Sequence, residues 1–340
     1  MKKKTIFIPG GAGYVGSKLV EISLKNNFKV ICLDKLVYGK NAISTFLNNS
    51  DFLFYEGDIR NDKDLEKIFK HKIDYVVNLA SIVGDKQCKT IAKTSYDINY
   101  NGNKLLFEIC KKNKVKKYLF ASTCSNYGIS TAKGFATEET KLNPVSLYAE
   151  TKIDCENYLL QTKGDSPTII ILRFGTAYGA SFRTRFDLTL NSFTYEALKY
   201  RKIDVFAKST WRPYIHVADV GEIMIRALNY VGNIHKEIFN AGYTSENYTK
   251  EQMVHRIINF LPDTEINYDL DDFDKRNYKV SCEKIKKKLN LNSHKNIDFG
   301  IKEIKELYLS NKITDKHVEE NLLDNNCNRL LNFFKNEKQN

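Results

Sequence analysis

Long apolar runs are missing from this chain of 340 residues. A membrane-spanning helix needs roughly 20 consecutive apolar residues, and no segment approaches that length. The apolar run behind the lysine-rich start, Thr5–Ile8, is followed at once by Pro9-Gly10, so it is too short for the core of a signal peptide. We therefore expect a buried first strand there, no membrane partner and a cytoplasmic protein.

Paired cysteines are missing as well. The seven cysteines are scattered, their number is odd, and no two of them have C-x-x-C spacing. A disulfide framework or a zinc site normally shows an even count or closely spaced pairs. The pattern favours reduced thiols and predicts no metal site.

Acidic residues are too few to balance the basic ones, 41 against 53, which gives a net charge of +12. A net positive charge is typical of proteins that bind a nucleic acid, a membrane surface or an anionic small molecule. The lysines are spread along the chain and mixed with acids and asparagines, so the charge alone decides little. We expect no nucleic-acid partner.

Short apolar runs do alternate with longer amphipathic stretches over the first half of the chain. This alternation predicts an α/β fold, a Rossmann-like doubly wound parallel sheet with helices on both faces. The second half is less regular, which predicts a smaller C-terminal lobe. The predicted strands are Thr5–Pro9, Lys29–Leu33, Phe52–Glu56, Tyr75–Leu79, Lys117–Ala121 and Thr168–Arg173, and the predicted helices are Val15–Asn26, Asp62–Lys70, Tyr96–Lys112 and Tyr148–Lys163.

The first predicted strand runs directly into a G-x-x-G-x-x-G pattern at Gly10, Gly13 and Gly16. The first glycine permits a sharp turn, the second lets the backbone approach a pyrophosphate, and the third lets the helix pack close to the sheet. The helix N-terminus adds free N–H groups and a partial positive charge. The pattern predicts a dinucleotide site that includes Tyr14 and Val15.

Acidic residues at the ends of the next two strands extend this site. Asp34 ends the second strand, where its carboxylate can accept hydrogen bonds from the adenosine ribose and repel a 2′-phosphate, so NAD is favoured over NADP. Asp58-Ile59 follow the third strand, where they can hold the adenine ring. The alternatives are a strand-end turn aspartate at Asp34 and a simple helix cap at Asp58.

Tyr148 and Lys152 stand four residues apart, on one face of a predicted helix. Tyrosine is a poor base because its ordinary pKa is about 10, but a nearby ammonium and a positively charged nicotinamide would both lower that pKa. The preceding strand ends in Ser122-Thr123, and a hydroxyl there can reach the same substrate oxygen. Thr123, Tyr148 and Lys152 are therefore the predicted catalytic residues.

Together these segments resemble the extended short-chain dehydrogenase/reductase family, in its NAD-dependent nucleotide-sugar epimerase/dehydratase branch. The resemblance covers almost the whole chain and looks more like a subgroup from bacterial polysaccharide gene sets than like the housekeeping galactose epimerase. The matching segments, in order, are Gly10–Gly16, Asp34-Lys35-Leu36, Gly57–Arg60, Asn78–Ser81, Asn99, Ser122–Gly128, Tyr148–Lys152, Arg173–Gly179 and Trp211–Asp219.

The resemblance implies a role for each of these positions. Tyr148 would be the general base and acid, Lys152 would lower its pKa and bind the nicotinamide ribose, and Thr123 would hydrogen-bond the reacting sugar hydroxyl. Further cofactor contacts are implied for Lys35, Leu79, Ala80, Ser81 and Asn99, the last of which is mostly architectural in the family. Asn78 would also line the cofactor, at a position where many relatives have His.

The substrate implied by the resemblance is a nucleotide-diphosphate sugar. Arg212 and Arg276 would pair with its diphosphate, for which a guanidinium is suited. Asn191 would help to hold the nucleotide, and Thr176 stands where many 4-epimerases have Asn. The alternative for Arg212, Arg276 and Asn191 is a surface or loop residue. His216 lies on a predicted buried strand and is expected to be a hydrogen-bonded structural histidine.

The reaction implied begins with removal of a proton from a sugar hydroxyl, at C4, and hydride transfer to NAD. We expect an NAD-dependent nucleotide-sugar epimerase that acts through a transient 4-keto sugar. The alternative is a 4-dehydrogenase or 4-ketoreductase, for example on a heptose nucleotide, with net hydride transfer. Retention of the three catalytic residues argues against a non-catalytic dinucleotide-binding protein.

The residues after Thr123 bear on dehydration. Relatives that eliminate water typically carry Asp-Glu there, whereas this chain has Cys124-Ser125, which disfavours 4,6-dehydration. Cys124 is then either an acid/base for a ring epimerisation or a small residue packed beneath the sugar.

The motifs also set the expected domain boundaries. Residues 1–176 form the NAD-binding Rossmann domain, with returning segments from about 200–240, residues 177–330 form the substrate-binding lobe, and residues 331–340 form a frayed tail. By the resemblance, the helices at 96–112 and 148–163 build a homodimer.

Overall fold

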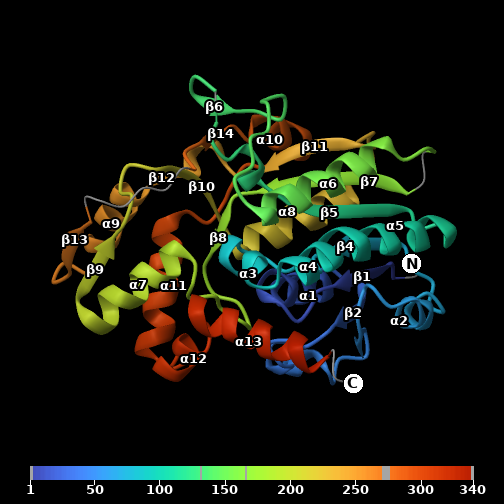
Figure 1. The fold of residues 1–340 in the computed structure, drawn as a ribbon, viewed down its shortest axis with the longest axis horizontal. Coiled ribbons are helices and arrows are strands. Elements are labelled where there is room, and N and C mark those ends of the chain that lie inside the picture. The colour runs from blue at the N-terminus through green and yellow to red at the C-terminus, as the bar shows by residue number, and fades with distance from the viewer. Residues whose placement is uncertain (1–2, 131, 165–166, 270–275, 338–340) are drawn as a thin grey trace.

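The computed structural model describes residues 3–130, 132–164, 167–269 and 276–337. Its central sheet has seven strands in the order β11-β7-β5-β4-β1-β2-β3, and every neighbouring pair is parallel (Figure 1). The predicted Rossmann-like sheet is therefore confirmed. Its strands are β1 (Thr5–Pro9), β2 (Lys29–Asp34), β3 (Phe52–Glu56), β4 (Tyr75–Asn78), β5 (Lys117–Thr123), β7 (Thr168–Phe174) and β11 (Glu237–Ala241).

Helices cover both faces of this sheet because alternate residues of each buried strand point to opposite sides. In β1, Ile6 and Ile8 join the core cluster with Leu19 of α1 (Tyr14–Lys25) and Val220 of α8 (Val217–Asn229). Phe7, between them, joins a second cluster on the other face. Helices α2 (Asp62–Ile68), α5 (Asn103–Lys112) and α6 (Leu147–Gln161) are among those that contribute to this second cluster.

The helix predicted at 96–112 is not continuous. The short α4 (Ala92–Tyr96) leads into a π-helical segment, η2 (Asp97–Gly102), before α5 begins. Within η2 the side chain of Asn99 bonds to the backbone of Ile82 in another loop, accepting from its N–H at 2.7 Å and donating to its carbonyl at 3.0 Å. Such π-bulges are frequent beside functional sites.

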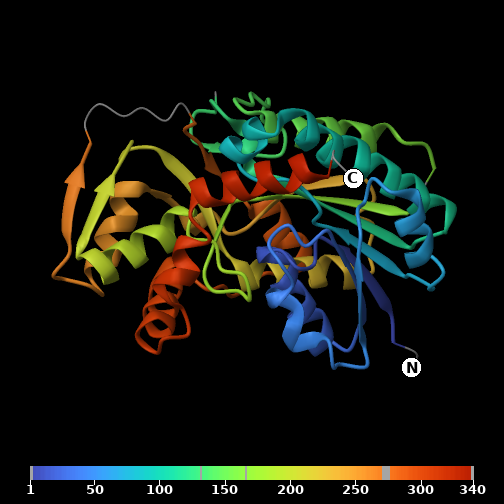
Figure 2. The same cartoon turned by 60° about the horizontal axis from the view of Figure 1, so that its bottom comes forward.

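The smaller lobe lies beside the carboxyl ends of the sheet (Figures 1 and 2). Its core brings Tyr178, Leu190, Ile203, Met253 and Ile301 together. Its elements are β8 (Thr176–Tyr178), α7 (Thr189–Tyr200), β9 (Lys202–Val205), β10 (Trp211–His216), β12 (Asn247–Thr249), α9 (Lys250–Ile258), β13 (Glu265–Tyr268), α11 (Ile297–Leu309) and α12 (Asp315–Glu319).

Segments from about residues 200–240 were expected to return to the Rossmann domain, and only some of them do. Strand β9 pairs with β13 in the smaller lobe, whereas α8 packs on α1 and β11 completes the main sheet. The return to the Rossmann domain therefore begins later than residue 200. The remaining elements are η1 (Asn41–Phe46), α3 (Asp85–Thr90), η3 (Cys124–Tyr127), β6 (Phe135–Ala136), η4 (Thr244–Glu246), β14 (Lys279–Val280) and α10 (Glu283–Leu289).

The end of the chain differs most from expectation. Residues 331–336, predicted to fray, form the last turns of α13 (Leu323–Asn336), and residues 338–340 lie outside the described part of the chain. The helix is held because Leu330 and Phe334, 0% and 5% exposed, insert into the core cluster on one face of the sheet. No helix in the described ranges has the length and hydropathy of a membrane span.

Candidate active site

One cleft of about 620 Å³ opens at the carboxyl ends of the central strands, the usual ligand position in a doubly wound sheet. The loops that follow β1, β2, β3, β4, β5 and β7 all contribute to it. Eighteen of the residues singled out in the sequence line it: Gly10, Gly13, Tyr14, Val15, Gly16, Asp34, Lys35, Asp58, Ile59, Leu79, Ala80, Ser81, Thr123, Tyr148, Lys152, Thr176, Arg212 and Arg276. Asn99 and Asn191 do not.

The glycine loop has the close contacts that a dinucleotide site needs. Gly10 has a φ of +82°, and a Cβ on Gly16 would lie 2.1 Å from the carbonyl oxygen of Gly10, so neither position accepts a side chain without distortion. No side chain caps the N-terminus of α1, and its first turn contains no acidic residue. Its N–H groups and helix dipole therefore face the cleft as a site for the pyrophosphate of NAD.

Asp34 organises the adenosine end of the cleft. Its carboxylate accepts hydrogen bonds from the backbone N–H of Ala12 at 3.0 Å and of Leu36 at 2.9 Å, which joins the loops after β1 and β2. Burial raises its pKa, and these two N–H groups oppose that rise. The Asp34 carboxylate thus holds the turn at the end of its strand, as the alternative interpretation supposed. It also lines the cleft.

Asp58 is not the helix cap that the alternative interpretation supposed. The cap of α2 is Asn61, whose side chain accepts from Lys63 and Asp64. Asp58 instead pairs with Arg60 at 2.6 Å and with Lys35 at 3.2 Å. The neighbouring Arg60 guanidinium and Lys35 ammonium outweigh the effect of burial and lower the pKa of Asp58.

Asn78 and Asn99, for which a cofactor contact was predicted, are buried behind the wall of the cleft and do not line it. The Asn78 amide donates to the side chains of Asn103 and Tyr118, in the latter case at 2.8 Å, and is 1% exposed. Asn99, fully buried, accepts from the Ser81 hydroxyl at 2.9 Å as well as bonding Ile82. Asn99 therefore fixes the loop after β4, which is its architectural role.

The three predicted catalytic side chains converge in the middle of the cleft. The Thr123 hydroxyl, at the end of β5, lies close enough to Tyr148, near the start of α6, to lower the pKa of that tyrosine. The Lys152 ammonium is 3% exposed, donates to the carbonyl of Ala121 at 3.0 Å and lies 5.8 Å from the ring centre of Tyr148. A sugar hydroxyl placed at Tyr148 would meet a proton acceptor and a second hydroxyl.

The pKa of Tyr148 was expected to be lowered by Lys152 together with a bound nicotinamide, and the protein chain without NAD raises it. Burial raises it well above its usual value, while the Arg185 guanidinium and the Thr123 hydroxyl oppose the rise. Burial also lowers the pKa of Lys152 to about 8, so its charge is partly lost near neutral pH. A positively charged nicotinamide bound beside Tyr148 would lower its pKa.

A buried ion pair holds the end of β5 from below. Arg173 on β7 donates to Glu156 on α6 from Nε at 3.0 Å and from Nη2 at 2.5 Å, and both side chains are at most 3% exposed. Glu156 also accepts from Ser122 and Asn126, which flank Thr123. The pair therefore fixes the position of the catalytic strand end.

Removing Glu156 tests this support. Glu156→Ala leaves the Arg173 charge buried without its partner, so we expect a loss of about 3–5 kcal/mol in the free energy of unfolding. Urea denaturation measures it. Glu150→Ala, on the exposed face of the same helix, is the matched control and should change stability by less than about 0.5 kcal/mol. Equal stability of the two variants would contradict a structural role for the pair.

Cys124 faces away from the cleft. Its thiol donates to the carbonyl of Arg173 at 3.2 Å and is 2% exposed, and burial raises its pKa. Of the two interpretations of Cys124, the small residue packed beneath the site is the one that this geometry supports. Its neighbour Ser125 lines the cleft and was not singled out in the sequence.

Two arginines meet at the substrate end of the cleft. The Arg212 guanidinium donates to the carbonyl of Arg276 and lies 5.1 Å from the ring centre of Tyr278. Arg276 itself pairs with Asp85, at the start of α3, at 2.7 Å. Both guanidiniums are positioned by other groups in the cleft wall, where a diphosphate can compete for their donors.

Asn191, which was predicted to help hold the nucleotide, does not line the cleft. It is fully buried, accepts from the N–H of Gly179 at 2.9 Å and donates to the carbonyl of Arg185 at 2.9 Å. It thereby shapes the loop after β8, which brings Arg185 into the cleft wall. Asp187 holds that guanidinium through two bonds of 2.9 and 2.7 Å, and only the Arg-x-Asp spacing hinted at this pair.

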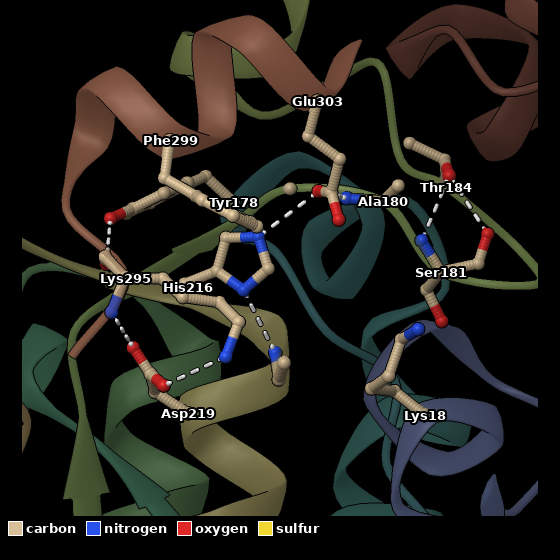
Figure 3. Close-up of polar contacts among 12 residues, drawn as sticks. Lys18, Tyr178, Ala180, Ser181, Thr184, His216, Asp219, Lys295, Phe299 and Glu303 are labelled. Carbon is tan, nitrogen blue, oxygen red and sulfur yellow. Dashed lines mark hydrogen bonds and ion pairs between the residues drawn. The ribbon is translucent and has the colours of Figure 1, made fainter. Parts of the chain in front are cut away.

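His216 is the hydrogen-bonded structural histidine that the sequence led us to expect (Figure 3). Its Nε2 lies 3.0 Å from the Glu303 carboxylate of α11, and its Nδ1 accepts from Ala218 at 3.2 Å. The same Glu303 oxygen accepts from the N–H of Ala180 at 2.6 Å (Figure 3). This cluster ties the smaller lobe to the loop after β8 and so helps to position the substrate end of the cleft.

Comparisons with known proteins agree with this geometry. The chain is 27% identical to UDP-glucose 4-epimerase of Bacillus subtilis over 275 residues, 73% of this chain and 80% of that protein. The fold is similar to UDP-glucose 4-epimerase of Thermotoga maritima with UDP-glucose, with a TM-score of 0.81, 26% identity, and 91% and 99% of the two chains covered.

A dTDP-glucose 4,6-dehydratase of Bacillus anthracis in complex with NAD is similar too, with a TM-score of 0.80, 25% identity, and 93% and 99% coverage. The description of the matching family is "NAD dependent epimerase/dehydratase family", and the match runs over residues 6–242. Together with the dinucleotide loop at one end of the cleft, this match establishes that the chain belongs to the NAD-dependent epimerase/dehydratase family.

Proposed function

We propose that this protein is an NAD-dependent nucleotide-sugar epimerase that acts through a transient 4-keto sugar. The observation that carries the proposal is that one cleft is lined by the glycine loop, by Thr123 and Tyr148, and by Arg212 with Arg276. A nucleotide diphosphate bound at the arginines would present its sugar to Tyr148. UDP-glucose 4-epimerases are among the similar proteins.

The chain's own residues supply the acid–base part of this reaction. The Tyr148 oxygen removes the proton of the sugar hydroxyl and returns it after the keto sugar has turned, a role worth roughly 10²–10⁴-fold in rate. Thr123 hydrogen-bonds the same sugar oxygen, and Lys152 fixes the active-site end of α6 through the carbonyl of Ala121. Bound NAD supplies the hydride acceptor and donor.

A 4-dehydrogenase or 4-ketoreductase, for example on a heptose nucleotide, is the second candidate. Thr176 favours it, because this residue lines the cleft where many 4-epimerases have Asn. Elimination of water has less support, since the residue after Thr123 is Cys124, whose thiol bonds to Arg173 behind the cleft.

A panel of nucleotide sugars incubated with the pure enzyme and NAD tests the proposal by mass spectrometry and NMR. A product of unchanged mass with one inverted sugar centre, and no net NADH, is the result expected for the epimerase. A product lighter by two hydrogens, with NADH formed in step, would overturn it in favour of the dehydrogenase. A product lighter by one water would overturn both.

We also propose a homodimer in the cytoplasm that serves polysaccharide biosynthesis. Helices α4 and α6 each offer an aromatic side chain for such a contact: Tyr96 at the end of α4 is 39% exposed, and the hydroxyl of Tyr158 on α6 bonds to Glu108. Light scattering of the purified protein should give twice the chain mass, and a monomer at micromolar concentration would refute the dimer.

A further inference from the structure

Helix α13 crosses from the smaller lobe back over the main domain. It follows α12 and ends beside the loops after β2 and β3, which is visible in both views of the chain (Figures 1 and 2). The family match ends at residue 242. The helix therefore brings a segment that lies beyond the family match to the loops that carry Lys35 and Arg60.

The inner face of α13 forms part of the cleft wall. Asn326 and Phe334 both line the cleft. The Asn326 side chain, 1% exposed, accepts from the Arg183 guanidinium at 3.4 Å, and that guanidinium lies 3.5 Å from the ring centre of Tyr38. Arg183 and Tyr38 line the same cleft, so the helix closes against groups of both lobes.

Apolar packing holds the helix in this place. Leu330 and Phe334 belong to the core cluster that contains Leu33 of β2 and Ile59, the residue after Asp58. These are the residues directly behind the expected ribose and adenine positions. The Phe334 ring also lies 5.9 Å from the Arg60 guanidinium. Undocking α13 would thus expose the wall of the adenosine site itself.

Ion pairs fasten the two ends of the helix to residues of the main domain. Near its start Asp324 pairs with Lys86, and just past its end Glu337 pairs with Lys35 and, at 3.5 Å, with Arg60. Asp324 and Lys86 are largely exposed, so their pair contributes little to holding the helix. The inner face of the helix is held by the packing of Leu330 and Phe334, and its end by the partly buried pairs of Glu337.

We infer that α13 is a built-in cover of the cofactor site, which must undock before NAD can leave and which keeps one NAD bound through many turnovers. The inference rests on the proposed function and deepens it. A retained cofactor can return its hydride to the sugar that it was taken from without leaving the protein, as an epimerase requires. A dehydrogenase needs to exchange NADH for NAD in each cycle.

Release of NAD from the purified holoenzyme tests the cover without any sugar. Alcohol dehydrogenase and ethanol in excess convert each released NAD into NADH, whose fluorescence reports the release rate. We expect Phe334→Ala to release NAD at least about tenfold faster than the unchanged protein, because the truncated ring weakens docking of the helix. Asn332→Ala, on the exposed face of α13, is the matched control and should release NAD at the unchanged rate.

Either of two results would overturn the cover. One is release from the unchanged holoenzyme within the mixing time, and the other is equal release from the Phe334→Ala and Asn332→Ala proteins. If Phe334→Ala fails to fold, hydrogen exchange of the unchanged protein decides instead: added NAD should slow the α13 amides, and equal exchange with and without NAD refutes the inference. Slow NAD release together with an oxidised sugar product would leave the cover standing and refute the epimerase.

Discussion

Replacing Tyr148 by Phe should lower kcat on the accepted nucleotide sugar by roughly 10²–10⁴-fold. The change removes one oxygen, and the ring that helps to line the cleft stays in place. The lost oxygen is the proposed proton acceptor, and it lies near the Thr123 hydroxyl. Since the ring remains, the amount of NAD bound should not change.

Single-turnover and steady-state rates of Tyr148→Phe, measured beside its NAD content, separate a chemical defect from a binding defect. Tyr158→Phe is the matched control, because Tyr158 lies on the same helix and bonds to Glu108 on the outer side. It should keep the full rate. Sugar turnover by Tyr148→Phe at the unchanged rate would refute the catalytic assignment and, with it, the enzyme proposed here.

The parts of the fold and site that sequence predicted well depend on local geometry. The glycine loop needs small residues at fixed spacing because Gly16 approaches the Gly10 carbonyl. Since these glycines lie close together in the chain, their pattern is visible in the sequence. Asp34 at the end of β2 and the Tyr148–Lys152 pair on α6 follow from element ends and helix periodicity in the same way. The buried parallel strands are visible in the sequence as short apolar runs. Ile6, Phe7 and Ile8 of β1, for example, are all 0% exposed.

The parts that sequence missed depend on contacts between distant segments. Nothing local distinguishes an Asn that reaches a ligand from Asn99 or Asn191, whose amides are used up by the backbone of other loops. The polar end of the chain looked frayed because the partners of Leu330 and Phe334 come from β2 and the loop after β3. The net pKa of Tyr148 required knowledge of burial, which outweighs the charges nearby.

Replacing Lys152 by Met should stabilise the NAD-free protein while lowering its turnover. Burial lowers the pKa of Lys152 from 10.5 to about 8, so below pH 8 the folded protein carries a charge that is better solvated in the unfolded chain. Removing this charge should raise the free energy of unfolding at pH 7 by up to about 3 kcal/mol. Turnover should fall by roughly 10²-fold, since the ammonium beside Tyr148 is lost.

The pH dependence gives this prediction its sign. Between pH 8 and 10.5 the unfolded chain keeps the proton that folded Lys152 has released, so the unchanged protein gains stability as the pH rises through this window. Lys152→Met lacks that gain, and its advantage at pH 7 should therefore shrink toward zero near pH 10.5. Urea denaturation at pH 7 and pH 10, with the exposed Lys112→Met as control, measures both points. If the Lys152→Met protein is less stable than the unchanged one at pH 7, the Lys152 ammonium stabilises the fold. That result would contradict the prediction that the buried charge lowers the free energy of unfolding.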